Sequence, residues 1–262
     1  MYLVHNKENV RSIRSTFIWC LLAFLSGMIN SFSYHRLKLF VSHVTGTSTT
    51  IGMAMADHQW KLEFEVIGIF FSFMLGTFAA VKLIGPVIWK HQLKELYWTH
   101  FIVSGILLTM LVLMTSTSFS WLTQLETYIE VESFLLAFLC GLINSSAVLC
   151  SHGLIRVTHM TGVATDIGMA YGKYLFHPNR QERYLEKKLF WERVSKLCSF
   201  IIGAYWSALL FREKPSYALS CIFALSLVPP ALHHLKIKVI ASKATEQQEK
   251  QGEKQQIDQV LQ

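Results

Sequence analysis

The sequence predicts an all-α, polytopic membrane protein with about six spanning helices and two re-entrant or broken segments. Of its 262 residues, 52% are hydrophobic and only 16% are charged, whereas soluble domains carry about 25% charged residues. Asp, Glu, Lys and Arg are absent from residues 15–34, 96–125 and 133–155. Because about 20 apolar residues form a helix that crosses a bilayer, these runs predict membrane spans.

An internal duplication is the second observation behind this prediction. Residues 42–54 and 158–170 share a polar motif, although both lie in apolar stretches, and a shorter match precedes each copy at residues 27–31 and 141–145. Two ordered matches indicate two sequence repeats. The motif matches are His43/His159, Thr45/Thr161, Gly46/Gly162, Thr49/Thr165, Ile51/Ile167, Gly52/Gly168, Met53/Met169 and Ala54/Ala170.

Eight apolar segments follow one another, at residues 16–34, 38–57, 65–83, 96–116, 131–150, 153–175, 195–211 and 216–235. The first four form repeat one (15–116) and the last four form repeat two (131–235), within a single transmembrane domain over residues 15–240. We expect residues 1–14 to be a cytoplasmic N-terminus. Residues 241–262 have little to bury and predict a disordered cytoplasmic tail.

Three further sequence features complete the prediction. The basic stretch 173–193 contains the turn signal His177-Pro178-Asn179 and is predicted to be a cytoplasmic connector. Pro229-Pro230 should kink or end the last span. Gly76 of the third segment aligns with Gly203 of the seventh.

Segments 38–57 and 153–175 are the least lipid-like. If both enter and leave on the same side, more Lys and Arg lie inside, and the loop at 126–132, which has neither, lies outside. Each repeat then has three spans, so the two repeats are inverted, as in many transporters with discontinuous helices near the bilayer midplane. If both segments cross fully, parallel four-helix repeats remain open.

Asp166 is the sharpest single candidate for a functional role. A carboxylate at membrane depth costs roughly 2.5–3.5 kcal/mol, so it usually faces a cavity or a partner. On a helix, His159, Gly162 and Asp166 share one face, which suits a proton relay or a cation site. The structural alternative is a cap, or an interfacial position beside Lys173. Repeat one has Thr50 at the place of Asp166.

The other candidates come from matched positions in the two repeats. A membrane histidine is often only an interhelical hydrogen-bond donor, and an asparagine can bond unwound backbone across a helix interface; direct substrate contact is the alternative for both. Glycines at these places either pack helices or permit a break. The predicted substrate- or ion-binding residues are Asn30, His43, Thr45, Thr49, Asn144, His159, Thr161, Thr165 and Asp166. The predicted hinge or packing glycines are Gly27, Gly46, Gly52, Gly141, Gly162 and Gly168.

Several classes of function lack a supporting pattern. No GxSxG, HExxH, P-loop or Rossmann fingerprint is present, so no enzyme and no cofactor is predicted. Two histidines and Asp166 are formally enough for a metal, but nothing else supports one. A net charge of +7 fits basic cytoplasmic loops better than nucleic acid.

Four motifs carry a resemblance to a known family. They are Gly-x-x-Asn-Ser at 27–31, His-x-Thr-Gly at 43–46, Gly-x-x-Asn at 141–144 and Thr-His-x-Thr-Gly-x-x-Thr-Asp-Ile-Gly at 158–168. The chain here resembles the YoaK family of bacterial inner-membrane proteins, a domain of unknown function, over about residues 15–235. That family often has Asp at the place of Asn30 and Asn at the place of Thr47. The resemblance implies a fold and a location, but no substrate.

Two functions are expected from these observations. The first is a transporter or permease for a small solute, with proton or cation coupling as an option. The second is a non-transporting scaffold or partner-binding protein whose polar motifs only join helices. The expected partners are the lipid bilayer and an unidentified solute, with a homo-oligomer left open and no nucleic acid.

Overall fold

The computed structural model describes residues 13–89, positions 103, 105–107, 109 and 110, and residues 126–228 except 152 and 154. Throughout this part of the chain, the regular structure is helical. The predictions for residues 1–12, for most of 96–116 and for 229–262 lie outside the described residues. The principal helices are α2 (Ile13–Leu37), α3 (Val44–Ala56), α4 (Trp60–Trp89), α6 (Glu126–Cys150), α7 (Met160–Phe176), α8 (Arg180–Glu213) and α9 (Pro215–Ser226).

Four of these helices, α2, α4, α6 and α8, are long and apolar enough to cross a membrane. The chain is therefore built as a helical membrane protein. The predicted spans 16–34, 65–83, 131–150 and 195–211 each lie inside one of them. Helix α9 begins with Pro215 in its first turn, where a proline costs no helix hydrogen bond.

The segments predicted to be broken each contain irregular backbone followed by a short helix. Helices α2 and α6 are followed by residues with left-handed backbone, Lys38 (φ 60°) and Gly153 (φ 84°), a conformation that ends helices. Helices α3 and α7 have 13 and 17 residues, or about 20 and 26 Å at 1.5 Å per residue. Both are shorter than the roughly 30 Å hydrocarbon core.

The spanning helices pack in two pairs, α2 with α8 and α4 with α6. A Cβ added at Gly27 of α2 would collide with the backbone carbonyl of Phe200, and one at Gly203 of α8 would collide with that of Phe24. The two backbones therefore touch at a reciprocal pair of glycines. Any larger residue must push the helices apart.

The other pair repeats this arrangement. A Cβ at Gly76 of α4 would collide with the carbonyl of Phe138, and one at Gly141 of α6 with that of Phe73. In the predicted repeats, Gly27 corresponds to Gly141, and Gly76 roughly to Gly203. The first helix of each predicted repeat thus packs on the third helix of the other.

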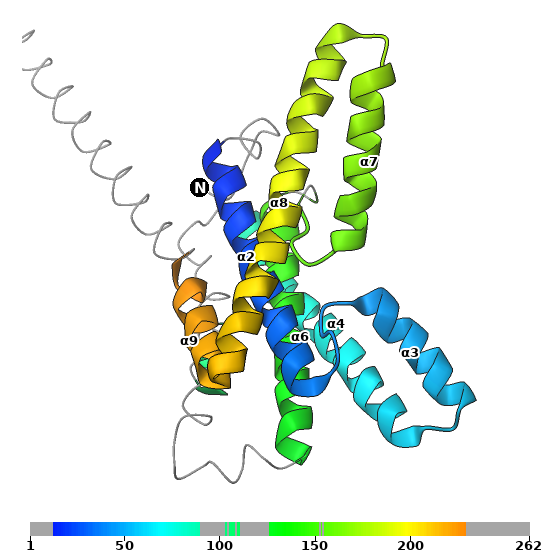
Figure 1. Cartoon of the computed structure of the whole chain (residues 1–262), viewed down its shortest axis with the longest axis vertical. Coiled ribbons are helices and arrows are strands. Elements are labelled where there is room, and N and C mark those ends of the chain that lie inside the picture. The colour runs from blue at the N-terminus through cyan, green and yellow to red at the C-terminus, as the bar shows by residue number, and fades with distance from the viewer. Residues whose placement is uncertain are drawn as a thin grey trace, which may run out of the picture.

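Helices α3 and α7 lie beside α4 and α8, respectively. Figure 1 shows both short helices starting near the middle of the molecule and running outward in diverging directions. The N-terminal ends of α3 and α7 are therefore central, and their C-terminal ends are peripheral.

The prediction that residues 173–193 form a connecting loop was wrong. Only residues 177–179 separate α7 from α8. The Asn179 side chain accepts hydrogen bonds from the backbone N–H groups of Gln181 (2.8 Å) and Glu182 (3.4 Å), which caps the start of α8. The charged stretch that follows consists largely of good helix formers, so α8 extends well beyond its apolar part.

Candidate functional site

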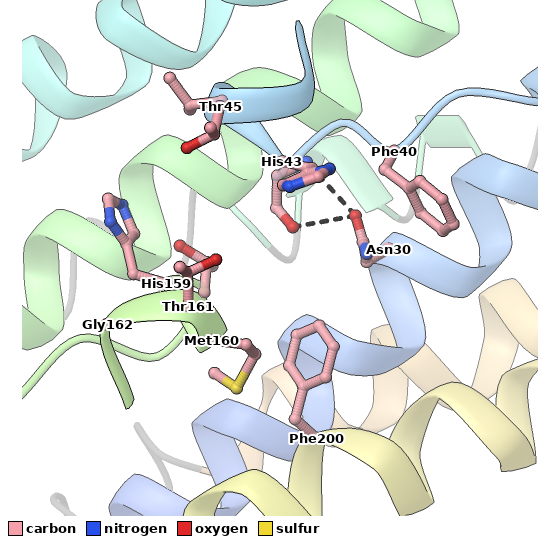
Figure 2. Close-up of a pocket in the computed structure, with 12 residues that line it drawn as sticks. Asn30, Phe40, His43, Thr45, His159, Met160, Thr161, Gly162 and Phe200 are labelled. Carbon is pink, nitrogen blue, oxygen red and sulfur yellow. Dashed lines mark hydrogen bonds between the residues drawn. The ribbon is translucent and has the colours of Figure 1, made fainter. Parts of the chain in front are cut away.

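The starts of α3 and α7 meet at one pocket of about 390 Å³. Figure 2 shows that its labelled residues come from α2, α3, α7 and α8 and from the irregular backbone before each short helix. Both copies of the duplicated motif therefore contribute to a single site. The lining residues are Asn30, Phe40, Ser42, His43, Val44, Thr45, Thr158, His159, Met160, Thr161, Gly162 and Phe200.

The two short helices begin in the same way. His43 precedes α3 with φ −92° and ψ 67°, and His159 precedes α7 with φ −88° and ψ 70°. Neither histidine side chain caps its helix. The N–H groups of a first helical turn have no acceptor within the helix. In α7 the Met160 N–H donates to the Thr158 carbonyl at 3.1 Å, and neither helix start has a side-chain cap near the pocket.

Asn30 fixes the irregular backbone of the first copy. Its Oδ1 accepts hydrogen bonds from the backbone N–H of Ser42 (3.3 Å) and from the Ser42 hydroxyl (2.9 Å). Because a backbone N–H can only donate, the amide oxygen must face Ser42. The NH₂ group of Asn30 is then the part of its amide that remains to donate.

Asn144 does the same in the second copy. Its Oδ1 accepts from the backbone N–H groups of Val157 (3.1 Å) and Thr158 (3.3 Å), and the residue is 5% exposed. Both asparagines thus bond irregular backbone, which is the structural role predicted from the sequence. Asn30 also lines the pocket, whereas Asn144 does not.

Thr158 differs from its counterpart Ser42 in one respect. The Ser42 hydroxyl donates to Asn30. The Thr158 hydroxyl is buried, in a residue only 5% exposed, and has no hydrogen-bond partner among the described residues. Thr158 lines the pocket. The second copy therefore presents an unused buried hydroxyl at the site.

The two histidine rings have different surroundings. The His43 ring lies against the first turn of α3, where a Cβ added at Gly46 would collide with it. The His159 ring lies near Phe73 of α4, with ring centroids 6.4 Å apart. Gly46 is therefore needed for the position of one histidine, and the other contacts the opposite copy.

Some predicted site residues lie away from the pocket. The hydroxyls of Thr49 and Thr165 donate to the carbonyls of Thr45 (3.0 Å) and Thr161 (3.1 Å), one turn back in their own helices. Neither Thr49 nor Thr165 lines the pocket. Both hydroxyls therefore use their hydrogen-bond donors within their own helices.

Asp166 also lies outside the pocket lining. Its Oδ2 is 3.8 Å from Nε of Arg193 on α8, and Nη1 of Arg193 donates to the Asp166 carbonyl at 3.0 Å. The Asp166 side chain is 45% exposed. Asp166 is thus placed where it joins α7 to α8.

The predicted glycines divide into two groups. Gly27 and Gly141 lie at helix contacts, and Gly46 faces the His43 ring. A Cβ at the remaining ones, Gly52, Gly162 and Gly168, would meet no described atom within 4 Å.

Sequence reasoning missed several lining residues. Ser42 and Thr158 stand inside the repeated motif, and their matched positions were a usable signal. Phe40, Met160 and Phe200 carry no sequence signal, because an apolar residue in an apolar stretch does not reveal what it faces.

Hydrogen-bond donors and apolar groups make up the pocket wall. None of its lining residues is Asp, Glu, Lys or Arg. The polar groups are the two helix starts, two histidines, one amide and four hydroxyls, and the apolar part comes from two phenylalanines, a valine and a methionine. The wall thus has no formally charged side chain, but it offers several hydrogen-bonding groups to a small ligand.

The fold and the site define a helical membrane protein with a polar pocket between the starts of two broken segments. The chain belongs to the DUF1275 family, a group of proteins of unknown function, whose family model matches residues 18–229. The predicted YoaK-like character agrees with this membership. No curated protein and no solved structure is similar enough to match the chain.

Proposed function

We propose that this protein is a transporter or permease for a small solute in the bacterial inner membrane. The observation that carries the proposal is the convergence of the α3 and α7 starts on one pocket. Discontinuous helices that meet near the bilayer midplane commonly form the substrate site of secondary transporters. Irregular backbone at membrane depth is tolerated where protein or a water-filled cavity satisfies it.

The proposed architecture is a pair of inverted repeats with six spans, with 38–57 and 153–175 as the broken segments and both termini cytoplasmic. Three matched features support it: the reciprocal glycine contacts, the two asparagine bonds to irregular backbone and the near-identical backbone angles of the two histidines. In such folds the two halves move against each other around a fixed site.

Coupling to a proton or a cation is a further part of the proposal. His159 lines the pocket and is the predicted coupling residue with the most direct access to a solute. Asp166 pairs with Arg193, so a coupling role for it requires that this pair opens during transport.

Access of water to the pocket tests the proposed function. Thr161→Cys and Thr45→Cys would be made in a chain whose native cysteines are replaced, and labelled from each membrane face with a membrane-impermeant thiol reagent. Ala137→Cys is the control, because Ala137 is fully buried in the core. The native cysteines are Cys20, Cys140, Cys150, Cys198 and Cys221.

We expect both pocket cysteines to be labelled, from a face that depends on the conformation, while the Ala137→Cys variant stays unlabelled. Absence of labelling from either face in folded protein would contradict the proposal. The two asparagine–backbone contacts would then favour the alternative, a scaffold whose polar groups only join its segments.

A further inference from the structure

We infer that the solute is a small organic anion, bound by its carboxylate at the starts of α3 and α7. This inference rests on the proposed function for the identity of the pocket as a solute site. It adds a ligand class, which neither the family nor the sequence motifs supply.

The first argument is the electrostatics of two helix starts. Each helix N-terminus carries about half of a positive elementary charge from its aligned peptide dipoles, and its free N–H groups form an anion site. Here two such ends line the same pocket, at Thr45 of α3 and at Thr161 of α7. The lining residues include no Asp or Glu that would repel an anion.

The second argument is the Thr158 hydroxyl and does not depend on the helix dipoles. Nearly all buried polar side chains have a hydrogen-bond partner, but this hydroxyl has none among the described residues. Its counterpart Ser42 is already bonded to Asn30. A buried donor in a pocket-lining residue, with no acceptor among the described residues, favours a ligand oxygen that accepts from it.

The remaining polar groups fit an acceptor better than a cation. The Asn30 oxygen is used by Ser42, which leaves its NH₂ group as a donor. Calcium and magnesium ions need oxygen ligands, preferably carboxylates, and the lining side chains supply no carboxylate. The lack of a carboxylate also disfavours a zwitterion, because its ammonium group would have no anionic partner.

The apolar part of the wall points to an organic anion. Phe40, Met160 and Phe200 lie around the polar groups in Figure 2, and a pocket of about 390 Å³ exceeds the needs of a halide. A carboxylate has two oxygens to share between two helix starts. A short hydrocarbon or aromatic body would fill the space beside the phenylalanines.

The test measures thermal stability of the whole purified protein in detergent at constant ionic strength. The probes are butyrate and benzoate, their neutral analogues butyramide and benzamide, and the inorganic anions phosphate and sulfate. A ligand that binds the folded state raises Tm in a concentration-dependent way. We expect a saturable increase with at least one carboxylate and none with its amide.

Matched variants locate the effect. Thr158→Val keeps the side-chain shape and removes the hydroxyl, and we expect the affinity for the carboxylate to fall at least tenfold. Thr158→Ser restores a hydroxyl and should recover most of the binding, which separates loss of the ligand contact from misfolding. Ser207→Ala is the control, because the Ser207 hydroxyl is also buried without a partner in the part of the chain that the structure describes, but Ser207 does not line the pocket.

Three results would overturn the inference. They are no stabilisation by either carboxylate, equal stabilisation by acid and amide, or unchanged binding in the Thr158→Val variant. Stabilisation by phosphate or sulfate alone would also overturn the organic-acid assignment. Saturable carboxylate binding without conformation-dependent cysteine labelling would support the anion site and contradict the transport proposal. Cysteine labelling without carboxylate binding would support the transport proposal and contradict the anion site.

Discussion

The α3–α4 and α7–α8 hairpins begin alike and then differ in charge. Helix α3 has no charged residue, whereas α7 is joined to α8 by Lys173–Glu186 (3.4 Å) and by Asp166–Arg193 (3.8 Å). Their starts, at His43 and His159, have nearly the same backbone angles.

This difference distinguishes the features that form the pocket from those that hold each hairpin together. Both starts line the pocket, and the two ion pairs lie along the body of the second hairpin only. The shared features therefore belong to the site and to the packing of the four long helices. The two ion pairs of the second copy join the helices of its own hairpin.

The largest expected effect tests the part that the two copies share. Gly27→Ala and Gly141→Ala each place a Cβ against a backbone carbonyl of the facing helix, and such overpacking costs about 1–3 kcal/mol or more. We expect a marked loss of folded protein for both variants, measured as the monodisperse yield after detergent extraction.

Gly52→Ala and Gly168→Ala are the controls for the glycine contacts, because no described atom lies near the added methyl. They should extract like the unchanged protein. If only one of the two contact variants lost stability, the two helix pairs would not be equivalent.

The next effect concerns a buried charge pair found in the second copy. Oε1 of Glu192 lies 3.2 Å from Nζ of Lys196 on α8, and the two side chains are 8% and 6% exposed, respectively. Removing one partner leaves a buried charge, at a cost of about 3–5 kcal/mol. Glu192→Leu should therefore lower Tm strongly, whereas Glu192→Leu combined with Lys196→Leu should restore most of it.

The first copy supports the expectation for the double variant. Counting back from Gly76 and Gly203, it has Ile69 at the place of Lys196, and Ile69 is a buried core residue. If the double variant were as unstable as the single one, the ion pair would stabilise the fold by more than the neutralisation of each charge by the other.

A smaller effect compares the two asparagines. Asn144→Ala removes the acceptor of two buried backbone N–H groups, and an unsatisfied buried donor costs about 1–3 kcal/mol. Asn30→Ala should cost less, because Asn30 bonds one N–H and one hydroxyl and is only partly buried. Denaturant unfolding followed by tryptophan fluorescence would measure both.

Asn30→Asp is the matched control for this pair, since it keeps an acceptor oxygen for Ser42. We expect it to remain closer in stability to the unchanged protein than Asn30→Ala. Equal destabilisation by Asn30→Ala and Asn144→Ala would contradict the expectation that the more deeply buried asparagine contributes more to stability.

The smallest expected effect on stability is that of Asp166→Asn. The Asp166–Arg193 pair is partly exposed, and such pairs contribute roughly 0.2–1 kcal/mol. The variant should fold and insert normally, with a Tm close to that of the unchanged protein. Its solute uptake then decides the coupling role, because a fully active variant would limit Asp166 to the contact between α7 and α8.

Much of the fold follows from local sequence, because hydropathy and helix-breaking signals act over short distances. Apolar segments predicted the spans that α2, α4, α6 and α8 contain, and the polar motifs marked the two segments predicted to be broken. The matched glycines were recognisable too, since only glycine allows such close backbone contact. The helical structure of most of 173–193 was missed, because a dense run of charged residues resembles a loop unless the helix-capping role of Asn179 is taken into account.

The sequence by itself determined which residues are polar, which are paired between the copies and where the helices break. Only the tertiary structure decided that the two helix starts share a pocket, that Phe200 of α8 lines it and that Asp166 faces Arg193. These outcomes depend on how α2 packs on α8 and α4 on α6, which joins residues far apart in the chain. The Thr158 hydroxyl, which has no partner among the described residues, is a result of the same packing, because a side chain becomes buried only in the folded molecule.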